Sequence, residues 1–141
     1  MRVGSFDLQI GAYEGYNLMA DVSFWKATPE ERAAVCGGCG PGKWGNWFVP
    51  DTILGERITP ACDIHDWHYS VGKTIYDKLI ADLFLWVDAQ IVTDDGDLLD
   101  IARSYRNTTY YNAVRRCGDG AFLKGKAGLD CLMADLHHSM A

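Results

Sequence analysis

The sequence lacks a long apolar run, a surplus of positive charge and an even number of cysteines. No segment approaches the roughly 18 to 20 consecutive apolar residues that a membrane-spanning helix needs. The 13 lysines and arginines are outnumbered by 19 aspartates and glutamates, and the formal net charge is −6. Such a surface repels phosphate backbones and anionic headgroups, so we expect no nucleic-acid partner and only apolar contacts with lipid.

The first residues, 1–7, also lack the apolar core of a secretory signal peptide. We therefore expect a cytoplasmic protein, an already processed chain, or one released by a non-classical route such as a secretion apparatus or a virion. Five cysteines do not make the paired set that is typical of a secreted disulfide framework. Two disulfide bonds with one free thiol remain open, and so does a metal site.

The chain has the length and composition of a single globular domain, 1–141, which we expect to be a monomer. We predict a mainly α fold with little β structure. Residues 1–27 mix aromatics with glycines, show no sustained period and are interpreted as short strand-like or irregular pieces. Cap-plus-proline pairs and apolar periodicity predict four helices, over about residues 28–36, 59–72, 74–92 and 98–116.

One face of the second predicted helix is polar. Cys62, His65, Asp66 and Tyr69 stand at i, i+3, i+4 and i+7, which places them on one side of a helix. The helix that follows is almost wholly apolar, so this face should point inward. Buried polar groups are costly unless they are paired or used, and the face therefore predicts a functional site. His68 lies off this face and is interpreted as a solvated surface side chain.

The next helix should supply a carboxylate to this face. Because the turn around Gly72 is tight, the two helices should pack antiparallel, which we expect to place Asp77 opposite His65. An imidazole beside a buried carboxylate is a base with an orienting partner, and the attacking group would be water. Asp77 as a cap of its own helix is the alternative. Asp82, with Lys78 four residues before it, is interpreted as half of an exposed ion pair.

A glycine- and aromatic-rich loop over residues 36–58 precedes the polar face. Its glycines can adopt left-handed conformations that turn several carbonyls toward one point, and loops of this length are often functional. Asp66 points toward the loop. One carboxylate with several carbonyls is a hard-oxygen site that suits Ca²⁺, which would polarise a substrate carbonyl.

These residues resemble the phospholipase A2 superfamily, particularly its bacterial, fungal and viral-capsid types. The family's Cys-x-x-His-Asp-x-x-Tyr helix is matched by residues 62–69. The Cys-Gly-Pro-Gly at 39–42 is similar to the family's calcium loop, and the Tyr-Asp-Lys at 76–78 stands where secreted members carry Cys-Asp-Arg. The stretch at 110–115 resembles a Tyr-Tyr-x-Ala-Val run of bacterial and fungal members.

The resemblance covers about residues 36–123 and leaves 1–35 as an unassigned N-terminal extension. It implies a calcium-dependent carboxylic ester hydrolase of lipid degradation, which cleaves the sn-2 ester of glycerophospholipids at a membrane surface. His65 would activate water, Asp77 would orient His65, and Tyr69 would hydrogen-bond to that aspartate. The resemblance also implies four Ca²⁺ ligands, namely Asp66 and the carbonyls of Gly38, Gly40 and Gly42. The amide of Gly40 would donate to the oxyanion.

The chain also departs from the family. His68 and Tyr76 replace cysteines that are common in secreted animal members, so their disulfide network is absent. A Cys39–Cys62 disulfide bond is similar to one in the family, and we expect it only in an oxidising setting.

Two alternatives remain open. The pairs Cys36-x-x-Cys39 and Cys62-x-x-His65 have the ligand types and spacing of a tetrahedral zinc site, which would use His65 as a ligand and not as a base. A catalytically inactive phospholipase-like protein with a binding or structural role would carry the same residues.

Overall fold

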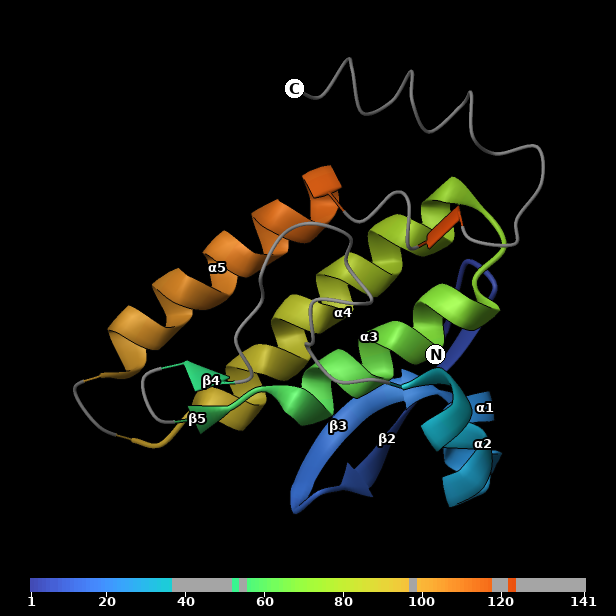
Figure 1. The fold of residues 1–141 in the computed structure, drawn as a ribbon, viewed down its shortest axis with the longest axis horizontal. Coiled ribbons are helices and arrows are strands. Elements are labelled where there is room, and N and C mark those ends of the chain that lie inside the picture. Colours follow the sequence, from blue (N-terminus) through green and yellow to red (C-terminus); the bar gives the residue numbers. More distant parts are fainter. Residues whose placement is uncertain (37–51, 54–55, 97–98, 118–121, 124–141) are drawn as a thin grey trace.

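The computed structural model of the chain describes residues 1–36, 52–53, 56–96, 99–117 and 122–123 (Figure 1). The described part combines a three-stranded antiparallel sheet near the N-terminus with the helices that follow it. The prediction of a mainly α fold with little β structure is therefore wrong, because the fold is mixed. Most of the predicted glycine- and aromatic-rich loop over residues 36–58, including its calcium-loop motif at 39–42, lies outside the described residues, and residues 52–53 and 56–57 of it form short strands.

The N-terminal sheet has the strands β1, β2 and β3 in that order, which span Arg2–Val3, Phe6–Tyr13 and Tyr16–Asp21. β2 and β3 are joined by the two-residue turn Glu14-Gly15, with φ angles of 53° and 88°. Both angles lie in the left-handed region, as the type I′ turn of a hairpin requires. Alternate side chains of the two strands are buried, namely Phe6, Leu8, Leu18 and Ala20.

Two short helices follow the sheet, α1 (Val22–Lys26) and α2 (Pro29–Val35). The predicted start of α2 is confirmed, because the hydroxyl of Thr28 accepts a hydrogen bond from the N–H of Glu31 at 3.1 Å.

The long helices α3 (Thr59–Val71) and α4 (Ile75–Thr93) pack side by side and carry the residues of the predicted site. Gly72 ends α3. Thr74 begins α4 with a capping box, in which its hydroxyl accepts a hydrogen bond from the N–H of Asp77 at 3.1 Å. The sheet lies against one side of this helix pair (Figure 1), and β3 contacts both helices.

Helix α5 (Asp100–Cys117) lies along α4 on the side away from the sheet (Figure 1). The short strands β4 (Thr52–Ile53) and β5 (Glu56–Arg57) form an antiparallel ladder before α3. Among the described residues, no helix combines the length and the apolar character needed to cross a membrane.

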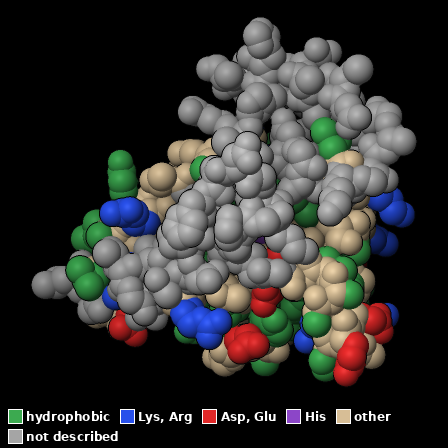
Figure 2. All heavy atoms as spheres, viewed as in Figure 1, with side chains coloured by type: hydrophobic (Ala, Val, Ile, Leu, Met, Phe, Trp, Pro, Cys, Tyr) green, Lys and Arg blue, Asp and Glu red, His purple; other side chains and the backbone are tan. Residues whose placement is uncertain are grey.

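The main hydrophobic core lies between the sheet, α3 and α4, and reaches α5. Its larger buried members are Leu18, Phe24, Ile64, Trp67, Leu85, Val92, Val114 and Phe122. Figure 2 shows acidic and basic side chains of the described part interspersed over one face of the molecule, which is typical of a solvated surface.

Candidate functional site

His65 lies in the middle of α3 and is directed toward α4. Only 1% of the residue is exposed. Its Nε2 atom lies 2.9 Å from Oδ1 of Asp82 on α4, which is the distance of a hydrogen bond. Because an ionised carboxylate can only accept, the neutral imidazole carries its proton on Nε2 and its lone pair on Nδ1.

The carboxylate of Asp82 is the centre of a buried cluster. The hydroxyl of Tyr69 donates to Oδ1 at 2.6 Å, and the ammonium of Lys78 donates to Oδ2 at 2.8 Å. The side chains of Lys78 and Asp82 are 1% and 0% exposed. The prediction of an exposed ion pair is therefore wrong, because the two residues have the expected i,i+4 spacing on the buried face of α4.

Asp77 has another role, and the prediction that it orients His65 is wrong. Its carboxylate accepts hydrogen bonds from the backbone N–H groups of Lys73 and Thr74 at 2.7 and 3.0 Å. A third comes from the N–H of Ser5 at 2.9 Å, in the turn between β1 and β2. Asp77 thus caps α4, as the alternative interpretation proposed, and it also joins the sheet to this helix.

The register of α3 against α4 explains why Asp82, and not Asp77, lies opposite His65. His65 stands eight residues before Lys73, and Asp82 stands nine residues after it. In an antiparallel pair that turns at Lys73, Asp82 is therefore level with His65, and Asp77 is level with Tyr69. The predicted hydrogen bond from Tyr69 to the orienting carboxylate exists, but that carboxylate belongs to Asp82.

The electrostatics of the pair favour a neutral imidazole beside an ionised carboxylate. Burial lowers the pKa of His65, and the hydrogen bond to Asp82 offsets this only in part. Burial alone would raise the pKa of Asp82, but the hydrogen bond from His65 and the charge of Lys78 outweigh it and lower that pKa. These protonation states are the ones that a general base and its orienting partner need.

Asp66, the predicted metal ligand, is buried on α3 next to His65, with 7% of the residue exposed. Its predicted partners Gly38, Gly40 and Gly42 lie outside the described residues. Over the described ranges, no three His, Cys, Asp or Glu side chains come together as a metal site. The type and burial of this carboxylate fit a Ca²⁺ ion whose other ligands are carbonyls.

The cysteines bear on the zinc alternative. Cys62 is disulfide-bonded. Cys36 carries a thiol whose Sγ donates to the carbonyl oxygen of Asp63 at 3.1 Å. A sulfur in a disulfide bond has no thiolate charge to offer zinc. Cys39, the predicted partner of Cys62, lies outside the described residues.

His68 is a core residue, so its interpretation as a solvated side chain is wrong. It is fully buried, and its Nε2 accepts a hydrogen bond from the N–H of Asp21 at 3.0 Å. Its ring packs against Phe6 with 4.8 Å between the ring centroids. Burial, together with nearby His65, lowers the pKa of His68 to about 3. His68 therefore stays neutral and joins α3 to the sheet.

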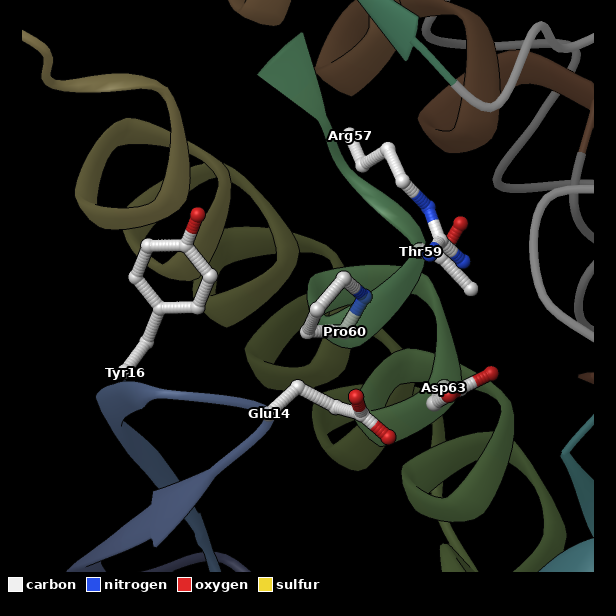
Figure 3. Close-up of a pocket in the computed structure, with 6 residues that line it drawn as sticks. All are labelled: Glu14, Tyr16, Arg57, Thr59, Pro60 and Asp63. Carbon is white, nitrogen blue, oxygen red and sulfur yellow. The ribbon is translucent and has the colours of Figure 1, made fainter.

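A cavity of about 310 Å³ lies at the start of α3 (Figure 3), and its lining consists of Glu14, Tyr16, Arg57, Thr59, Pro60 and Asp63. His65 is not among these residues, because it is directed toward α4. One lining carboxylate, that of Asp63, accepts a hydrogen bond from the hydroxyl of Tyr13 at 2.8 Å. This cavity is therefore separate from the His65–Asp82 pair.

The sequence interpretation missed two members of the site, Asp82 and Lys78. Their spacing is that of a surface ion pair, which is how they were interpreted. A signal was present in their neighbours, because Ile80, Ala81 and Leu85 lie around Asp82 and are all buried. A charged pair within such an apolar stretch indicates the buried side of a helix.

Comparison of the chain with family models, curated proteins and solved structures found no match.

Proposed function

We propose that the chain is a calcium-dependent, phospholipase A2-like hydrolase that cleaves the sn-2 ester of glycerophospholipids. The observation that supports this most is the buried hydrogen bond between His65 and Asp82, with Tyr69 on the same carboxylate oxygen. A neutral imidazole held by an ionised carboxylate is the arrangement that activates a nucleophile.

In this mechanism Nδ1 of His65 takes the proton from water. Nε2 already donates to Asp82, so the second nitrogen is the one that can accept a proton. The negative charge of Asp82 stabilises the imidazolium that forms as water attacks the ester carbonyl. The hydroxyl of Tyr69 fixes the Asp82 carboxylate by its hydrogen bond. The ring of Tyr69 lies 4.2 Å from the His65 ring, centroid to centroid, and this contact restricts rotation of the imidazole. His65 then returns the proton to the leaving alcohol.

Asp66, with the carbonyls of Gly38, Gly40 and Gly42, would hold Ca²⁺, which when bound polarises the ester carbonyl and stabilises the oxyanion. Asp66 follows His65 directly on α3 and is buried with it, so a ligand and the base would lie side by side. The amide of Gly40 would donate to the same oxyanion.

The zinc alternative is weaker, because Cys62 is disulfide-bonded and Nε2 of His65 is bonded to Asp82. Stoichiometric zinc in the purified protein would restore that alternative. An inactive member of the family would keep the same hydrogen bonds but would release no fatty acid.

The test is the release of fatty acid from phospholipid vesicles labelled at the sn-2 position. We expect release with Ca²⁺, loss of release with a chelator, and recovery when Ca²⁺ but not Mg²⁺ is added back, since Mg²⁺ requires a smaller octahedral shell. His65→Ala should lower the rate about 100-fold or more, the usual contribution of a general base. A rate of fatty-acid release that neither the chelator nor His65→Ala changes would overturn the proposal.

A further inference from the structure

We propose that Lys78 is a positioning residue for the base: it holds the Asp82 carboxylate against His65 and anchors that carboxylate to the end of α5. This inference rests on the proposed function. It goes beyond it, because the phospholipase A2 resemblance assigns no role to a lysine at this place.

The first argument is the geometry of the carboxylate. Oδ1 of Asp82 receives two hydrogen bonds, from His65 Nε2 and Tyr69 O–H, at 2.9 and 2.6 Å. Oδ2 receives the bond from Lys78 Nζ at 2.8 Å. A carboxylate that is held at both oxygens cannot rotate about its C–C bond without breaking one side. Lys78 therefore fixes the plane in which Asp82 meets His65.

The second argument is where the ammonium is anchored. Nζ of Lys78 also lies within hydrogen-bonding distance of two backbone carbonyls of α5, those of Val114 at 3.3 Å and Arg115 at 3.5 Å. Both residues belong to the last four of α5, whose carbonyls lack partners within the helix. A cation at a helix C-terminus is also favoured by the helix dipole. Lys78 thus joins the end of α5 to the α4 carboxylate that is bonded to His65 and Tyr69 of α3.

The third argument is charge. Lys78 and Asp82 are both buried, and a buried carboxylate without its counterion is strongly destabilised. With neutral His65, the cluster of imidazole, carboxylate and ammonium has no net charge. If Lys78 is removed, the carboxylate must turn toward another donor, admit water or bind a proton. Each of these changes the hydrogen bond that orients His65.

The test is a double-mutant cycle on phospholipid hydrolysis with Lys78→Met and Asp82→Asn. We expect Lys78→Met to lower kcat by about 10- to 100-fold, as removal of an orienting partner usually does, with little change in KM. In the Asp82→Asn background the same substitution should lower kcat no further, because Lys78 acts through Asp82. Lys73→Met is the matched control, since it removes an exposed lysine from the preceding turn.

A second readout does not depend on activity. The ¹⁵N resonances of the His65 ring should show Nε2 protonated and bonded in the wild type. They should shift in Lys78→Met, whereas Lys73→Met should leave them unchanged. Lys78→Gln, which keeps a donor for Oδ2, should give an intermediate kcat, and it replaces Lys78→Met if that variant does not fold.

Two results would overturn the inference: equal losses of kcat from Lys78→Met in both backgrounds, or a His65 ring spectrum that Lys78 substitutions leave unchanged. A wild type that hydrolyses no phospholipid would overturn the proposed function alone. The ring spectra would then still decide whether Lys78 holds Asp82 against His65.

Discussion

Three aspartates of α4 each have a different role, and the role of each follows from its hydrogen-bond partners. Asp77 accepts from backbone N–H groups and caps the helix. Asp82 accepts from His65, Tyr69 and Lys78 and belongs to the candidate site. Asp88 is fully buried and accepts one hydrogen bond, from the N–H of Met19 at 3.1 Å, and its Oδ2 atom has no hydrogen-bond partner among the described residues.

The burial of Asp88 gives a prediction about stability and pH. Burial raises its pKa from the ordinary 3.8 to about 7. Between these two values the folded state binds more protons than the unfolded state, so this group lowers stability as the pH rises from about 4 to about 7. Asp88→Asn keeps an acceptor for Met19 and removes the charge. We expect it to stabilise the protein at pH 8 by a few kcal/mol and to have little effect at pH 4.

Urea unfolding of the wild type and Asp88→Asn at pH 4 and pH 8 measures this difference. A gain from Asp88→Asn that is the same at both pH values would show that the carboxylate of Asp88 is not titrating in the folded protein.

At the scale of elements, α5 is attached to α4 mainly by polar side chains. Asn107 is buried and donates to Oε1 of Gln90 at 2.6 Å and to Oγ1 of Thr93 at 3.0 Å. Gln90 in turn donates to the hydroxyl of Ser104 at 2.8 Å. By contrast, Ile101 on the same helix is 83% exposed. Hydrogen bonds therefore fix the docking of α5 more than an apolar stripe does.

We expect Asn107→Ala to lower the free energy of unfolding by about 1–3 kcal/mol, because an acceptor on half-buried Gln90 and one on buried Thr93 lose their donor. Asn112→Ala, at an exposed position of the same helix, should change it by less than about 0.5 kcal/mol. Chemical denaturation of both variants measures the contrast. Equal effects would contradict a polar α4–α5 interface.

The elements differ in how far they could be predicted. The helices were predictable where a local signal marks an end, as with Thr28 before α2, Gly72 after α3 and Thr74 before α4. The strands within residues 1–27 were predicted only as short strand-like or irregular pieces, because Ile10 of β2 is 70% exposed, so apolar residues mark both solvent-facing and buried positions. The side on which α5 docks could not be predicted, since Asn107 provides it and no apolar period does.

The candidate site, too, was predictable only in part. The polar face of α3 was predictable, and its members His65, Asp66 and Tyr69 are buried as expected. Their partner on α4 depends on the register between the two helices, which is set by the position of the turn: counted from Lys73, Asp82 and not Asp77 is level with His65. Asp77 and Asp82 are five residues apart, which is about 1.4 turns of a helix.

At the scale of the whole molecule, the sheet and α5 are both attached to the α3–α4 pair. The sheet is joined to α3 by the bond between Asp21 and His68, and to α4 by the bond between Ser5 and Asp77. On the other side α5 reaches the Asp82 cluster through Lys78. The fold thus holds the base and its carboxylate from both sides, and a preorganised pair of this kind is what water activation requires.

The most direct measurement compares Asp82→Asn with Asp77→Asn for fatty-acid release from phospholipid vesicles at saturating Ca²⁺. Both substitutions replace a buried α4 carboxylate with a side chain of the same shape. We expect Asp82→Asn to lower kcat by about 10²- to 10⁴-fold, because His65 loses its orienting charge. Asp77→Asn should lower stability and leave kcat within about a factor of three. A larger loss of kcat from Asp77→Asn than from Asp82→Asn would contradict the site.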